Sequence, residues 1–208
     1  MTDQELIRAL RCCVSSQRLE AHMKPILFNT EMVRAILDDR KSVTRRVVKP
    51  GHLRVLDSQY HKEHPEVPDK TLLEKLCLPP YQPGDTLWVR ETWNGDWCDH
   101  YIYKADGGSA KAAGYAAEPK WRPSIHMPRE AARLFLRVKE VSVEKLREIS
   151  ALSAMDEGVT DWNDFVRLWN TTIKSADLPL YGWDANPWVW VIEFERIGKD
   201  EALGGGGD

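Results

Sequence analysis

The sequence predicts an α+β protein built on a mixed β-barrel of about six strands, flanked by helices. Apolar stretches rich in β-branched and aromatic residues recur along the chain, bounded by turn residues. Regular helices do not separate them, which argues against a doubly wound parallel sheet. A chain of 208 residues can bury a core, so a small, partly closed barrel fits best. We expect strands at 25–28, 44–48, 86–93, 101–105, 132–143 and 188–197.

Three helical segments are expected beside these strands. A helix over 30–37 begins at Thr30, whose hydroxyl can cap it, and has an apolar face. A helical turn over 150–155 ends before Gly158, a residue suited to a helix C-terminus. The segment 161–173 has aromatic and aliphatic residues at helical spacing.

The domain organisation is read from composition. Residues 1–22 form a weakly amphipathic stretch, which we interpret as a peripheral extension. Residues 23–197 are predicted to form one domain, with a long insertion at 52–80 that is either functional or mobile. Residues 198–208 end in a glycine run and are predicted to be a disordered tail.

Composition narrows the class of protein. A net charge of −3 argues against a protein that coats nucleic acid nonspecifically. No apolar run approaches the ~20 residues of a membrane span. The four cysteines form no C-x-x-C pair, and we read no secretory leader, so we expect a cytoplasmic protein with reduced thiols. His61 and His64 lack a third ligand nearby, so we predict no metal and no cofactor.

A cationic stretch lies at the junction between the predicted helix over 30–37 and the following predicted strand. It reads D-D-R-K-S-V-T-R-R and contains Lys41, Thr44, Arg45 and Arg46. Such junctions present side chains to ligands, and cations beside a hydroxyl suit an oxyanion or phosphate. The alternative is a solvated basic turn.

Glu91 is predicted to lie on the apolar face of the strand over 86–93. A carboxylate in such a place must be paired or poised for chemistry. Two interpretations stay open at this point, a substrate-contacting group or a buried ion pair with Arg45 or Arg46.

Nine tryptophans suggest ring recognition, although an ordinary core explains them equally well. They concentrate in two groups, one around Trp93 and one around Trp188. Between the groups, two prolines hold Ser124 and His126 in an extended segment. No orienting acid accompanies the serine, so we interpret His126 as a substrate contact rather than part of a triad.

Six motifs resemble ASCH-domain proteins when they are taken in order. Over roughly 23–197 they resemble the longer versions carried by bacteriophages and prophages. The resemblance implies a PUA-like β-barrel, with a cleft between barrel and helices that binds RNA or modified nucleosides. The motifs are M-K-P-I-L-F-N, D-R-K-S-V-T-R-R, P-G-D-T-L-W-V-R-E-T-W, P-S-I-H-M-P-R, D-E-G-V and N-P-W-V-W-V-I-E-F.

The resemblance also implies a catalytic set. One small bacterial member of the family, about half as long as this chain, is an amidohydrolase that removes the acetyl group of N4-acetylcytidine. Lys41, Thr44 and Arg46 match its lysine, threonine and arginine, and Glu157 matches its glutamate by its place after the long strand. Glu91 and Asp156 compete for that last role.

The resulting hypothesis is a protein that binds RNA or a modified nucleoside and deacylates N4-acylated cytidine. Trp93 or Trp188 would stack on the pyrimidine, and His126 or Asn186 would read its edge. A binding module without chemistry and a ribonuclease remain alternatives, and other ASCH proteins are described as each. The oligomeric state stays open.

Overall fold

The computed structural model describes residues 23–95, 101–107 and 120–204. The predicted extension at 1–22 lies outside these ranges, as do residues 205–208 of the predicted tail.

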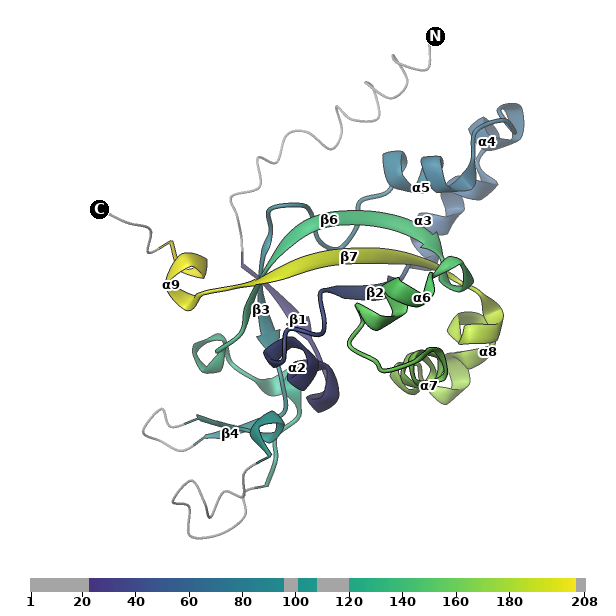
Figure 1. The fold of residues 1–208 in the computed structure, drawn as a ribbon. Helices are drawn as coiled ribbons and strands as arrows, with labels where there is room; N and C mark the ends of the chain where they lie inside the picture. Colours follow the sequence, from purple (N-terminus) through teal and green to yellow (C-terminus); the bar gives the residue numbers. More distant parts are fainter. Residues whose placement is uncertain (1–22, 96–100, 108–119, 205–208) are drawn as a thin grey trace.

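The main sheet is mixed and has five strands (Figure 1). β1 and β3 run parallel, and every other neighbouring pair is antiparallel. The edge strands β1 and β2 do not pair, so no closed barrel forms among the described residues and the expected closure is wrong. In spatial order the strands are β1 (Lys24–Leu27), β3 (Thr86–Arg90), β6 (Phe135–Lys145), β7 (Trp188–Ile197) and β2 (Val43–Val47).

The strand predicted over 86–93 is divided in two. β3 ends at Arg90, and a separate hairpin pairs β4 (Trp93–Gly95) with β5 (Tyr101–Tyr103). The chain changes direction at the two residues between β3 and β4. Trp93 therefore pairs with Tyr103 and not with a strand of the main sheet. The six predicted strand segments thus become seven strands in the described residues.

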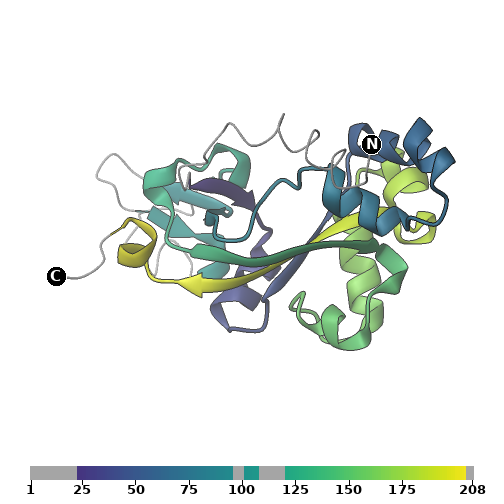
Figure 2. The same cartoon turned by 90° about the horizontal axis from the view of Figure 1, so that it is seen from above.

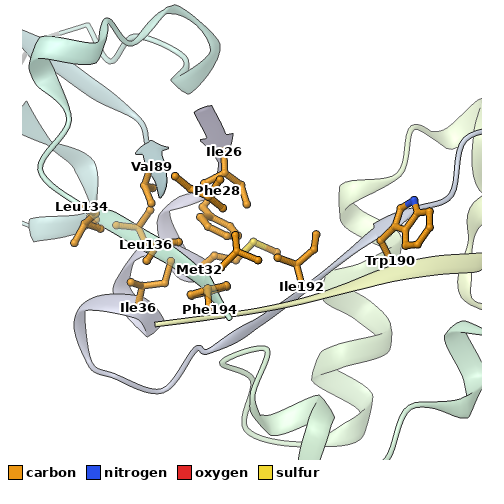
Figure 3. Packing of buried hydrophobic residues seen from close by; sticks show 14 of the residues in the cluster. Ile26, Phe28, Met32, Ile36, Val89, Leu134, Leu136, Trp190, Ile192 and Phe194 are labelled. Carbon is orange, nitrogen blue, oxygen red and sulfur yellow. The ribbon is translucent and has the colours of Figure 1, made fainter. Parts of the chain in front are cut away.

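The core lies on the concave side of the curved sheet and holds α2 (Thr30–Leu37). Alternate side chains of β7 face it, and Met32 and Ile36 fill it from the helix (Figure 3). Asn29, not Thr30, caps α2, since its side chain accepts from the Met32 amide at 2.8 Å. Fully burying each such apolar side chain contributes about 2 kcal/mol.

Helices cover both sides of the β6–β7 pair (Figures 1 and 2). The insertion at 52–80 is not a structureless loop, because it folds as α3 (Pro50–Leu53), α4 (Gln59–Glu63) and α5 (Asp69–Leu76) on one side. The predicted disordered tail also starts with a helix, α9 (Lys199–Ala202). Among the described helices, none has the length and apolar character needed to cross a bilayer. The others are α6 (Ala151–Met155), α7 (Trp162–Thr172) and α8 (Leu178–Tyr181).

Candidate functional site

A tight turn after α2 places Lys41 in the interior. Asp39 adopts a left-handed backbone with φ of 55°, and the amides of Arg40 and Lys41 both donate to the Ala35 carbonyl. β2 starts only at Val43. Lys41 therefore precedes the strand, and the strand alternation that would separate positions 41 and 44 does not apply to it.

Lys41 forms a buried salt bridge with Glu157. The Lys41 ammonium lies 2.5 Å from Glu157 Oε2 and also donates to the carbonyls of Glu157, at 3.0 Å, and Val43, at 2.7 Å. The two side chains are 0% and 5% exposed. Their backbones meet in an isolated antiparallel bridge, so a residue just after α6 is held against one just before β2. Burial lowers the pKa of Lys41, and Glu157 opposes this effect.

Arg45 holds the other oxygen of the same carboxylate. Its Nη1 lies 3.2 Å from Glu157 Oε1, while its Nε donates to Glu144 at 2.8 Å and its Nη2 to the Ser153 hydroxyl at 2.7 Å. The Arg45 side chain is 1% exposed. Glu157 thus has both oxygens bound by cations, and its orientation is set from α6, β2 and β6 together.

Arg46 connects the site to the opposite edge of the sheet. Its Nη1 donates to the Thr44 hydroxyl at 2.7 Å, and its Nη2 donates to the Leu27 carbonyl of β1 at 3.1 Å. The Lys41 ammonium and the Arg46 guanidinium lie 5.5 and 5.4 Å from the centre of the Phe28 ring. Thr44 and Lys41 therefore belong to one cluster around this ring.

A cavity of about 480 Å³ opens beside this cluster, between β2, the start of α2 and α7. Its size suits a nucleoside, since small-molecule sites occupy roughly 300–1,000 Å³. Thr44, which is 1% exposed, and Lys41 lie behind its wall rather than in it. The wall combines rings, arginines and short polar side chains: Leu27, Phe28, Asn29, Met32, Arg45, Arg46, Val47, Thr92, Pro123, Ser124, Trp169, Thr172 and Ile173.

A second hollow of about 550 Å³ is lined by Glu157 itself. Its wall is acidic on balance, because Glu31, Glu157 and Asp164 outnumber the one arginine there, Arg167. Met32 lines both hollows, so it stands between them. The acidic wall disfavours a phosphate or carboxylate there, and we place the candidate ligand in the first cavity.

Glu91 is the buried member of an ion pair. Arg133 binds its two oxygens at 2.9 and 3.0 Å, and Glu91 is 1% exposed. The partner is neither Arg45 nor Arg46, the two that the sequence suggested. Burial raises the pKa of Glu91, and Arg133 opposes the rise. Arg133 also lies 3.9 Å from the centre of the Tyr103 ring, so this pair joins β5 to the main sheet.

The structure places Trp93 and His126 apart from the cavity wall. Trp93 is 4% exposed and packs in a small cluster with Met127 and Ala131, with the Arg122 guanidinium 5.1 Å from its ring. His126 is exposed in a short 3₁₀ helix, η3 (Ser124–His126), whose first residue does line the cavity. The predicted extended segment, with Ser124 and His126 pointing the same way, is therefore wrong.

Asn186 and Trp188 have structural contacts at the start of β7. Asn186 has a left-handed φ of 46°, and its side chain accepts from the Arg147 amide at 2.8 Å. Trp188 packs against the main core, with the Lys145 ammonium 4.7 Å from its ring. Neither residue lines the cavity beside Arg46.

Sequence reasoning missed several residues of the cavity wall. Phe28 follows a strand and Trp169 lies on the inner face of α7, so both read as core residues. Arg45 belongs to the cationic stretch that the sequence singles out, but on its own it was predicted only as a possible partner of Glu91. Only the packing of α7 against β2 shows that these three share a wall. A buried charge inside a strand, as at Arg45, was the one available signal.

The described residues contain no group of three or more His, Cys, Asp or Glu that is suited to a metal ion. His61 instead lies 3.0 Å from Asp69 at the start of α5, and His64 lies 3.1 Å from Glu66.

Comparison with known proteins adds one structural likeness. No protein-family model matches the chain, and no curated protein matches its sequence. Among solved structures it is similar to protein EF3133 from Enterococcus faecalis V583, of family model DUF984. The identity is 11% and the TM-score 0.43, over 98% of this chain and 94% of that chain. At this level of likeness, nothing about function is carried over.

Proposed function

We propose that this chain is an ASCH-domain protein of the phage and prophage type, which binds a modified nucleoside, free or within RNA, in the cavity beside Arg46. We further propose that Lys41, Thr44 and Glu157 hydrolyse the N4-acyl group of an acylated cytidine. The observation that carries the proposal is the buried Lys41–Glu157 pair, which lies against the same Phe28 ring as Arg46, the residue that donates to the Thr44 hydroxyl.

The cavity wall supports a base-sized ligand with polar edges. Phe28 and Trp169 offer ring faces, and Asn29, Thr92 and Ser124 offer short donors and acceptors. These residues replace Trp93, Trp188, His126 and Asn186 in the recognition role first expected.

The pair can supply both proton transfers of amide hydrolysis. In the reacting form, Glu157 carries the proton that the pair shares, and Lys41 is a neutral amine. Lys41 then accepts the Thr44 proton as the Thr44 oxygen bonds to the acyl carbon. The C–N bond breaks, and Glu157 gives its proton to the departing exocyclic amine. Water then attacks the acyl–Thr44 ester, Glu157 takes one water proton, and Lys41 returns the hydroxyl proton. The products are cytidine and a carboxylic acid, and Arg46 is placed to stabilise the oxyanion.

A second candidate is binding without chemistry, and a specific observation favours it. Thr44 is 1% exposed and the Lys41 side chain is 0% exposed, so an acyl group in the cavity reaches them only if part of the cavity wall moves. In this alternative, Lys41 and Glu157 only stabilise the fold that shapes the cavity.

The test is to incubate the protein with N4-acetylcytidine and to quantify cytidine by chromatography. We expect turnover, and its rate should fall as the pH rises through the lowered pKa of Lys41, because the reacting form holds one proton on the Lys41–Glu157 pair and this titration removes it. The double variant Lys41→Met/Glu157→Gln removes both buried charges together, which spares the fold an unpaired ion. It should lose at least about 100-fold in rate.

The exposed Lys139 on β6 provides the matched control, and Lys139→Met should keep the full rate. Turnover by the double variant would contradict the hydrolase. Nucleoside binding with no cytidine from either protein would support the binding module. Fragmented RNA without released acid would support the ribonuclease instead.

A further inference from the structure

A rigid, basic turn stands at the mouth of the cavity and presents an unprotected apolar side chain. In η3, Ile125 is 59% exposed, and His126 beside it is also exposed. Pro123 and Ser124, which immediately precede Ile125, line the cavity. What sets Ile125 apart from a single exposed apolar side chain elsewhere is its place next to two residues of a nucleoside-sized cavity.

The turn is fixed from several directions. The amides of His126 and Met127 donate to the carbonyls of Pro123 and Ser124, both at 3.0 Å. Met127 is 1% exposed and anchors the turn in the small core around Trp93. Arg90 donates to the Ile125 carbonyl from β3. Ile125 is thus held in place by its backbone while its side chain stays free.

The charge around the turn matches a polyanion. Lys120, Arg122 and Arg129 are all exposed, and they outnumber the one exposed carboxylate that follows them, Glu130. This cationic stretch contrasts with the net charge of −3 for the whole chain. Phosphates on either side of a bound base would meet these cations, which supply position rather than sequence preference.

We propose that η3 acts as a wedge on structured RNA, in which Ile125 enters the base stack and the displaced nucleotide turns into the cavity beside Arg46. The inference rests on the proposed function, since it concerns how a paired base reaches that cavity. Apolar side chains inserted between base steps are a known way to offset unstacking, and enzymes that act on paired bases must turn them out. A free nucleoside needs no such step.

The experiment compares three ligands, each containing one N4-acetylcytidine: the free nucleoside, a single-stranded RNA and an RNA hairpin with the modified base in its stem. Affinities come from calorimetry for the nucleoside and from fluorescence anisotropy for the RNAs. A 2-aminopurine next to the modified base in the hairpin reports unstacking. Ile125→Ala should weaken hairpin binding at least tenfold and abolish the fluorescence rise, with nucleoside affinity unchanged.

Leu78 is a matched control, because it is 55% exposed but lies after α5, beside a different cavity. Leu78→Ala should leave all three affinities and the fluorescence rise unchanged. Equal hairpin binding and unstacking by wild type and Ile125→Ala would overturn the wedge while leaving the proposed function intact. An equal loss on all three ligands would also overturn it, because it would make Ile125 part of the cavity. Failure of the wild type to bind any ligand would overturn both proposals.

Discussion

Lys41 and Glu157 show how a buried charge pair is satisfied at the level of single residues. Taking two ions out of water costs several kcal/mol each, and the cost is recovered only where the remaining donors and acceptors are also bonded. Two carbonyls accept from the Lys41 ammonium, and Arg45 binds the second oxygen of Glu157. The lowered pKa of Lys41 indicates that burial outweighs this compensation, as expected of a lysine that acts as a base.

Glu91 gives a prediction about stability that is independent of any activity. Glu91→Ala leaves Arg133 without its bidentate partner at a site where Glu91 is 1% exposed. We expect a loss of about 3 kcal/mol in the free energy of unfolding, the low end for a broken buried pair, since Arg133 keeps access to water.

Urea denaturation at pH 7 measures this loss. Glu195→Ala, at an exposed position on β7, is the matched control and should change stability by less than about 0.5 kcal/mol. A similar small change for Glu91→Ala would show that the pair contributes little.

At the scale of elements, the site depends on a close approach between the end of α6 and the end of α2. Gly158 follows Glu157 with a φ of +86°, a conformation that glycine adopts without strain. A Cβ built there would lie 2.5 Å from Ala35 Cβ and 3.1 Å from Lys41 Cβ. The absence of a side chain at position 158 therefore lets Glu157 reach Lys41.

Gly158→Ala should destabilise the protein by about 2–3 kcal/mol, because it adds left-handed strain to a steric overlap with α2. Thermal unfolding followed by circular dichroism measures the effect. Gly51→Ala in α3 is the control, since no atom lies within 4 Å of a Cβ placed there, and it should be neutral or slightly stabilising. An unchanged melting temperature for Gly158→Ala would show that α2 can shift to accommodate the new methyl group without loss of stability.

At the scale of the whole molecule, Arg46 links the two edge strands of the sheet, which backbone pairing leaves apart. The sheet is open, and its edge strands β1 and β2 share no ladder of hydrogen bonds among the described residues, but the Arg46 side chain of β2 donates to the Leu27 carbonyl of β1. The cavity lies at this seam, and residues of both edge strands line it. Sites at such a seam are shaped by a few contacts rather than by a continuous ladder of hydrogen bonds.

Arg46→Met should therefore loosen β1 selectively. We expect hydrogen exchange at the Phe28 amide, which donates to Arg90, to accelerate about tenfold, the equivalent of one hydrogen bond to a charged group. The amide of Ile192 in the centre of the sheet should keep its protection. Arg167→Met, at an exposed arginine of α7, should alter neither amide. Uniform acceleration across the sheet would show that Arg46 stabilises the whole fold rather than its seam.

The sequence by itself determined the mixed class of the fold, the bounds of β7, the helical turn at α6 and the cluster of cations around the start of β2. Each is a local property, set by side-chain alternation, by capping or by adjacency in the chain. The tertiary structure alone decided which groups meet. It brought Glu157 to Lys41 across 116 positions, gave Glu91 to Arg133, and set Phe28 and Trp169 on one wall. Local patterns carry no signal for such pairings, because they depend on how α2, α6 and α7 pack on a sheet that curves without closing.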